Sequence, residues 1–144
     1  MSNGRTQFEQ SGTWSRWQIG KNGARRIIVA EDDREMRRLI AGTLIRDGYV
    51  VEEVSDGPKL LILVIEAAPP VDLVISDHRM PVSSGLQVLK GLRDAGWSLP
   101  FILLSAFGDD HLRSEASKLD AIFLDKPFEL DALRIIVRAA LTRL

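Results

Sequence analysis

The sequence contains no cysteine. Without thiols the chain can form neither a disulfide bond nor a thiolate metal site, so nothing points to an oxidising compartment. It also lacks a long apolar run, because the longest one, 60–65, is far shorter than the about 20 residues that span a membrane. The polar N-terminus has no apolar signal core. We therefore expect a soluble protein of the cytoplasm that does not bind membranes.

The chain has no excess of charge of one sign. Its 19 lysine and arginine residues nearly balance 20 aspartate and glutamate residues, which leaves a net charge of −1. This balance provides no general attraction for nucleic acids, so we expect no direct nucleic-acid binding. Hydrophobic residues make up 45% of the 144 residues, which is enough for the core of one ordinary domain.

Residues 1–23 differ in composition from the rest of the chain. They are mostly polar or small and show no sustained period of 2 or 3.6, which predicts a flexible N-terminal tail before a domain at 24–144. Trp14 and Trp17 stand out in this tail. They either pack loosely on the domain or form a docking peptide, since tryptophan is enriched at binding hot spots.

Two sequence patterns alternate after the tail. Short β-branched or apolar runs predict five strands at 27–30, 49–54, 71–76, 101–105 and 121–124. Helical spacing predicts five helices at 34–47, 58–68, 85–95, 109–118 and 129–144. Strands that alternate with helices form βαβ units. The expected fold is therefore α/β, with a mainly parallel sheet covered on both faces.

Two of the predicted helices carry apolar residues beyond those a core needs. The run 60–65 is apolar all round and could also be a strand, but it lies between two better strands. Some of its surface should be exposed, as should Ile135, which falls opposite the apolar stripe of the last helix.

Polar residues follow the predicted strands at the edge where parallel sheets bind ligands. The residues at these strand ends are Glu31, Asp32, Asp33, Asp77, Ser105, Asp125 and Lys126. Because these strands run in parallel, several carboxylates, a hydroxyl and an ammonium group should meet at one edge of the sheet. The sequence therefore predicts a polar site there.

These groups suit phosphoryl chemistry. The carboxylates of Asp32, Asp33 and Asp77 would repel one another unless a divalent cation lay between them, and oxygen ligands suit Mg²⁺. Lys126 can reach one phosphate oxygen, and Ser105 can donate a hydrogen bond to another. A carboxylate beside Mg²⁺ can attack phosphorus. His78 and His111 have no evident catalytic or metal-binding role.

Five motifs in order resemble the receiver domain of two-component response regulators. They are Ile-Ile-Val-Ala-Glu-Asp-Asp at 27–33, Val-Asp-Leu-Val-Ile-Ser-Asp-His-Arg-Met-Pro at 71–81, Gly-Leu at 85–86, Leu-Leu-Ser-Ala at 103–106 and Lys-Pro-Phe at 126–128. The resemblance covers 25–144. It implies a flavodoxin-like, doubly wound five-stranded parallel sheet of strand order 2-1-3-4-5, with five helices.

The resemblance also implies roles for individual residues. Asp77 would be the phosphoacceptor, and Mg²⁺ would be held by Asp77, Asp32, Asp33 and the backbone carbonyl of Arg79. Such a domain assists its own phosphorylation and dephosphorylation but is not an enzyme.

Further implied roles belong to residues around the phosphoryl group. Ser105 and Lys126 would contact it, and Ser105 and Phe123 would form the switch. Arg79 and Phe107 would flank it, and their bulk should hinder the attacking water, so we expect a long-lived phosphoryl state.

The resemblance implies partners as well. A histidine kinase or a histidine phosphotransfer protein would donate the phosphoryl group. A downstream protein target or a second copy of the chain would bind the face formed by 109–118, 121–124 and 129–144. No output domain is seen in the sequence, which fits either a stand-alone regulator or a fragment of a longer one.

Two alternatives remain at the level of sequence. The first is a phosphate-independent protein-interaction module of the same fold, in which Asp32 or Asp33 merely caps a helix. The second is a Mg²⁺-dependent aspartyl phosphatase of the haloacid-dehalogenase type. That class needs an Asp-x-Asp motif, whereas Asp32 and Asp33 are adjacent. A phosphatase would turn over a phosphate ester, a switch would trap one phosphoryl group, and a module would do neither.

Overall fold

The computed structural model describes residues 23–106 and 109–142. Strands and helices alternate through them, as the sequence predicts. The strands are β1 (Arg26–Ala30), β2 (Val50–Val54), β3 (Leu73–Asp77), β4 (Phe101–Ser105) and β5 (Ile122–Asp125). The helices are α2 (Arg34–Arg46), α3 (Gly57–Glu66), α4 (Gly85–Asp94), α5 (Asp110–Lys118) and α6 (Leu130–Thr142).

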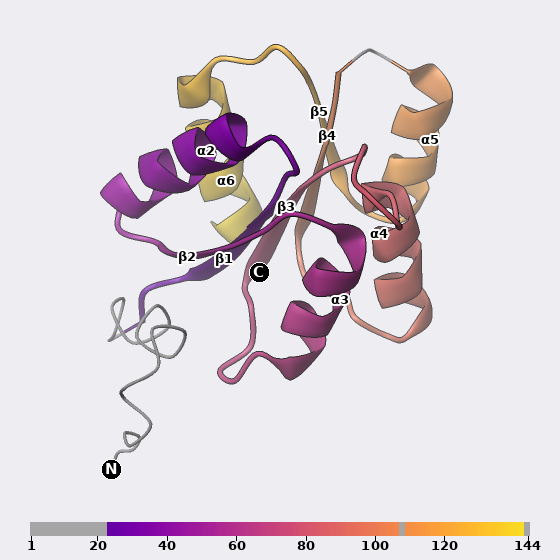
Figure 1. Ribbon diagram of the computed structural model, residues 1–144, viewed down its shortest axis with the longest axis horizontal. Helices are drawn as coiled ribbons and strands as arrows, with labels where there is room; N and C mark the ends of the chain where they lie inside the picture. The colour runs from indigo at the N-terminus through magenta and orange to yellow at the C-terminus, as the bar shows by residue number, and fades with distance from the viewer. Residues whose placement is uncertain (1–22, 107–108, 143–144) are drawn as a thin grey trace.

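The strands form one parallel sheet in the order β2-β1-β3-β4-β5. Helices α2 and α6 cover one face, while α3, α4 and α5 cover the other (Figure 1). The predicted doubly wound sheet and its strand order are therefore confirmed. The strand order reverses between β1 and β3, which is where open α/β sheets form their binding crevice.

The sheet separates two hydrophobic cores. In β1, Ile27 and Val29 belong to the core beneath α2 and α6, whereas Ile28 and Ala30 belong to the core on the opposite face. This alternation follows from the period of two along a strand. Burial on both faces explains why these strands have continuous apolar runs instead of an apolar–polar alternation.

The third strand begins and ends later than the predicted 71–76. The carboxylate of Asp72 accepts a hydrogen bond from the Arg26 amide at 2.8 Å, so this residue joins the start of β1 instead of opening β3. At the other end, Asp77 pairs with Leu104 of β4. Asp77 is therefore held by the sheet itself and not by a loop.

The apolar run 60–65 forms a helix, as predicted. Leu60 and Val64 of α3 are buried, whereas Ile62 is 54% exposed. On α6, Ile135 is 64% exposed, opposite the buried stripe that includes Leu133 and Val137. Both predictions of exposed apolar surface are therefore confirmed.

Several predictions concern residues that the structure leaves undescribed. Trp14, Trp17 and nearly all of the predicted tail lie in 1–22, and Phe107 lies in the gap at 107–108. The last predicted helix is described only to Thr142. Within the described ranges, no helix has the length and apolar character needed to cross a membrane.

The burial of α3 gives a test of the fold. Leu60→Ala should lower the free energy of unfolding by about 2–5 kcal/mol, because it leaves a cavity in the core. Ile62→Ala, two residues away, should change it by no more than about 0.5 kcal/mol, because Ile62 is largely exposed. Urea denaturation followed by circular dichroism measures both values. Equal losses in the two variants would contradict the assigned helix face.

Candidate functional site

The carboxyl ends of four strands bring polar residues to one edge of the sheet. Asp77 is the last residue of β3, and Glu31 directly follows β1. Ser105 ends β4, and Lys126 directly follows β5. The Lys126 amide donates a hydrogen bond to the Ser105 carbonyl at 2.6 Å, which joins the last two strand ends.

Lys126 lies between two buried carboxylates. Its ammonium nitrogen Nζ is 2.9 Å from Oε1 of Glu31 and 3.1 Å from Oδ1 of Asp77. The side chain of Glu31 is 2% exposed and that of Lys126 is 19% exposed, so water screens these charges poorly. The other carboxylate oxygen of Glu31, Oε2, accepts a hydrogen bond from the Asp33 amide at 3.2 Å.

The cluster contains more negative than positive charge. Burial raises the pKa of Glu31, and the nearby charge of Asp77 adds to this rise, against the opposing effect of the Lys126 hydrogen bond. Burial by itself lowers the pKa of Lys126, but the Glu31 hydrogen bond and the charge of Asp77 outweigh it and raise that pKa. Both shifts favour the protonated form: burial is the largest cause for Glu31, whereas the neighbouring carboxylates are the cause for Lys126.

A divalent cation would correct this imbalance. Glu31, Asp32 and Asp77 each offer a carboxylate oxygen, and these oxygens lie within 4.8 Å of one another. The donors are all hard oxygens, which suit Mg²⁺ better than Zn²⁺. The residues present therefore fit a magnesium ion.

Asp33 is not among these three residues. It is the N-cap of α2, and its side chain accepts hydrogen bonds from the amides of Glu35 and Met36 at 3.0 and 3.2 Å. Glu31, to which the sequence analysis gave no metal-binding role, joins Asp32 and Asp77 instead. A signal was present in the sequence, because a helix predicted to begin at Arg34 makes Asp33 the favoured capping position.

The loop after Asp77 packs against the strand end. The Gly85 amide donates to the His78 carbonyl at 2.8 Å, and a Cβ at Gly85 would collide with the Asp77 carbonyl oxygen. The loop therefore needs glycine at position 85 to return so close to Asp77.

Two other residues follow Asp77 in this loop. Burial lowers the pKa of His78, against the opposing effect of Asp77. The Arg79 side chain is exposed.

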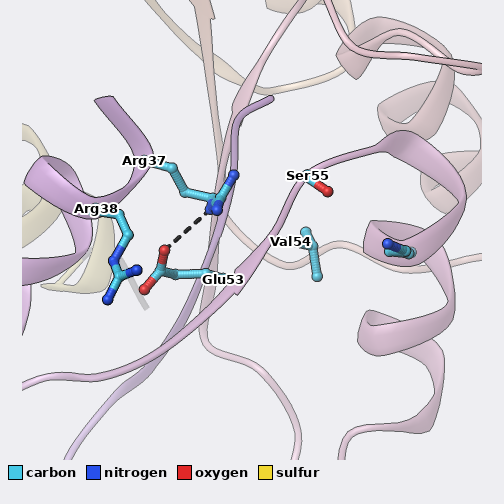
Figure 2. Close-up of a pocket in the computed structure, with 6 residues that line it drawn as sticks. Arg37, Arg38, Glu53, Val54 and Ser55 are labelled. Atoms are coloured by element: carbon cyan, nitrogen blue, oxygen red, sulfur yellow. Dashed lines mark hydrogen bonds and ion pairs between the residues drawn. The ribbon is translucent and has the colours of Figure 1, made fainter. Parts of the chain in front are cut away.

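Arg37 supports Glu31 from the side of β2. Its guanidinium donates to the Glu31 carbonyl at 3.0 Å and to the Glu53 carboxylate at 3.1 Å. Figure 2 shows Arg37 and Glu53 pointing toward each other, with a dashed line for their ion pair. Both residues line a hollow of about 270 Å³. Lys59, which also lines the hollow, forms an ion pair with Asp56 at 3.7 Å. Two of the three cations that line the hollow are thus paired with carboxylates. We therefore interpret the Arg37 contacts as support for the end of β1 and not as part of a ligand site.

The predicted switch residue Phe123 lies on β5, half-buried against the core beneath α3, α4 and α5. The guanidinium carbon of Arg113, on α5, is 4.6 Å from the centre of the Phe123 ring. Arg113 also forms an ion pair with Asp125 at 2.6 Å. Sequence reasoning missed Arg113, because no local motif predicts a contact between a helix and a later strand.

The raised pKa of Glu31 predicts a dependence of stability on pH. The native protein holds this proton more tightly than the unfolded chain, for which the ordinary value is 4.5. The contribution of Glu31 to stability is therefore full below pH 4.5 and is lost as the pH rises through the native pKa. In EDTA, urea denaturation should show this loss in the wild type but not in Glu31→Gln.

Glu35→Gln is the matched control, because Glu35 lies exposed in the first turn of α2. This variant should follow the wild-type pH dependence. A Glu31→Gln profile parallel to that of the wild type would contradict the shift.

Comparison with known proteins agrees with this geometry. The profile of the response regulator receiver domain matches residues 27–138. Response regulator MprA of Mycobacterium sp. (strain KMS) is 38% identical over 121 residues, which cover 82% of this chain and 51% of MprA. MprA of Mycobacterium leprae (strain TN) is 36% identical with the same coverage. The chain thus spans about half the length of these relatives.

Solved receiver domains share the fold. The receiver domain of Francisella response regulator 1452 has a TM-score of 0.78 and 29% identity, covering 83% of this chain and 98% of that one. A receiver domain protein from Clostridium thermocellum has a TM-score of 0.77 and 28% identity, covering 83% and 95%. Because the family profile matches most of this chain, the chain belongs to the response regulator receiver domains of two-component signalling.

Proposed function

We propose that this chain is a phosphorylation-activated switch that accepts a phosphoryl group on Asp77. The observation that carries the proposal is the buried contact between Asp77 and Lys126, at 3.1 Å, beside the carboxylates of Glu31 and Asp32. The donor would be a histidine kinase or a histidine phosphotransfer protein. The cytoplasm remains the expected location.

The proposed cofactor is Mg²⁺. Asp32 and Asp77 would hold it together with the backbone carbonyl of Arg79, as the sequence predicts. Glu31 would take the place that the sequence analysis gave to Asp33, because Asp33 caps α2 and Glu31 faces Asp77. When bound, the ion would neutralise charge on the transferring phosphoryl group.

The side chains of this chain would then act in a fixed order. A carboxylate oxygen of Asp77 attacks phosphorus, a new P–O bond forms, and the P–N bond to the donor histidine breaks with its electron pair left on the imidazole nitrogen. Lys126, already 3.1 Å from Asp77, pairs with a phosphoryl oxygen. Ser105, at the end of the adjacent strand, donates its hydroxyl hydrogen to another.

The phosphoryl group would act on the rest of the domain through charge. It adds close to two negative charges, which draw Lys126 and Ser105 toward it. Movement of Ser105 leaves room for Phe123 to turn inward, which changes the surface formed by α5, β5 and α6. A downstream target, or a second copy of the chain, would bind this surface, where Ile135 is already exposed.

Phosphorylation of the whole chain tests the proposal directly. Incubation with acetyl phosphate and Mg²⁺ should add one phosphoryl group, detected by intact mass. Asp77→Asn should add none, since an amide is not a nucleophile for phosphorus. Absence of any gain in the folded wild type would favour a phosphate-independent module, and sustained release of inorganic phosphate from a phosphate ester would favour a phosphatase.

Magnesium affinity tests the proposed ligands separately. Glu31→Gln and Asp32→Asn should each weaken Mg²⁺ binding about tenfold or more, since each removes a charged oxygen ligand or its close support. Asp33→Asn is the matched control and should leave affinity unchanged, because asparagine caps helices as well as aspartate does. Isothermal titration with MgCl₂ measures all three. A large loss in Asp33→Asn alone would restore the assignment made from the sequence.

A further inference from the structure

One arginine on α5 holds two side chains of β5. The guanidinium carbon of Arg113 is 4.6 Å from the Phe123 ring centre, and Nη2 is 2.6 Å from Oδ2 of Asp125. Phe123 and Asp125 are two residues apart on one strand, so they share the face on which α5 lies (Figure 1). A single guanidinium group therefore bridges both.

The contact with Asp125 fixes the position of the guanidinium. Among the described residues, Oδ1 of Asp125 is buried without a hydrogen-bond partner, and the ion pair with Arg113 through Oδ2 balances the charge of this carboxylate. Asp125 is also paired in register with Ser105 of β4 and precedes Lys126. Arg113 is thus anchored next to the strand ends of the site while its guanidinium carbon lies over the Phe123 ring.

We propose that Arg113 is a positioning residue that holds Phe123 in its resting orientation and thereby opposes phosphorylation. This inference rests on the proposed function, because it concerns the regulation of the same site. The Phe123 ring is only half-buried against the core at present, and the proposed switch turns it further inward. A contact that favours the present position must therefore disfavour phosphorylation equally. Arg113 therefore sets the balance between the two states of the unphosphorylated protein.

The strength of these contacts suits such a role. The Arg113 side chain is 46% exposed and that of Asp125 is 43% exposed, so both the ring contact and the ion pair are weak. Loss of contacts this weak should shift the two-state balance by about threefold to tenfold.

The first measurement reads the ring directly. The chain has 5 phenylalanines, so uniform labelling with 4-fluorophenylalanine gives a resolvable ¹⁹F spectrum, and Phe123→Leu identifies the Phe123 signal. Without phosphate, Arg113→Ala should move this signal toward its position in the phosphorylated wild type. Arg113→Lys, which keeps the charge but not the planar fork, should give an intermediate shift.

The matched control is Arg134→Ala. Arg134 forms a comparable exposed ion pair with Asp47 at 2.8 Å, between α6 and the end of α2. Its loss should leave the Phe123 signal in place. A shift of equal size in Arg134→Ala would overturn the assignment, because it would show a general loosening of the fold.

The second measurement is the rate of phosphorylation by acetyl phosphate at limiting concentration, followed by intact mass. Arg113→Ala should react about threefold to tenfold faster than the wild type. In a Phe123→Leu background the same substitution should have no effect, because its route through the ring is gone. A rate increase that persists in this background would show that Arg113 acts through Asp125 and Lys126, and would overturn the proposal.

The experiment separates the two levels of inference. If the wild type takes up no phosphoryl group, the proposed function fails, and the inference about Arg113 fails with it. If the wild type is phosphorylated but Arg113→Ala matches it in both rate and ¹⁹F spectrum, only the role of Arg113 is rejected.

Discussion

The arrangement of the site depends on one partly buried charge, the ammonium group of Lys126. It lies between Glu31 and Asp77, whose strands bring them together at the point where the strand order reverses. Two buried carboxylates this close would repel each other strongly without it. Because one ammonium does not balance the acidic residues there, the site retains an attraction for cations. The same residue thus makes the acidic cluster tolerable and leaves it ready for a divalent ion.

The central strands of the sheet and its edge strand β5 differ in burial. The residues of β3 and β4 are all buried, so Asp77 stands on a rigid support in the middle of the sheet. The residues of β5 are only partly buried, and Phe123 lies among them. Repacking a side chain at this margin disturbs few core contacts, whereas repacking one near Asp77 would disturb many. In the proposed switch, repacking of Phe123 would therefore leave the support of Asp77 intact.

Sequence patterns predicted the fold well because burial on both sheet faces leaves clear apolar runs such as 27–30 and 101–105. They predicted less well which two of three consecutive acids join Asp77. The choice depends on where β1 ends and α2 begins, and the structure gives the cap to Asp33 and the cluster to Glu31. The contact of Arg113 with Phe123 joins residues from different elements, and no local pattern encodes it. Local sequence patterns thus predict the helices and strands. Contacts that long side chains make between elements can be identified only from the tertiary structure.

The place of β5 in the sheet has a consequence for solubility. It is one of the two edge strands of the sheet and, within the described residues, pairs with β4 alone, so its other side offers backbone groups for pairing with another chain. The strand has only 4 residues and ends in Asp125, and charged Arg113 lies beside it. Short length and flanking charge are the features that protect exposed strand edges from aggregation. Substitutions at β5 or Arg113 that change the switch must therefore also preserve this protection, since without it unfolded or partly unfolded chains would self-associate.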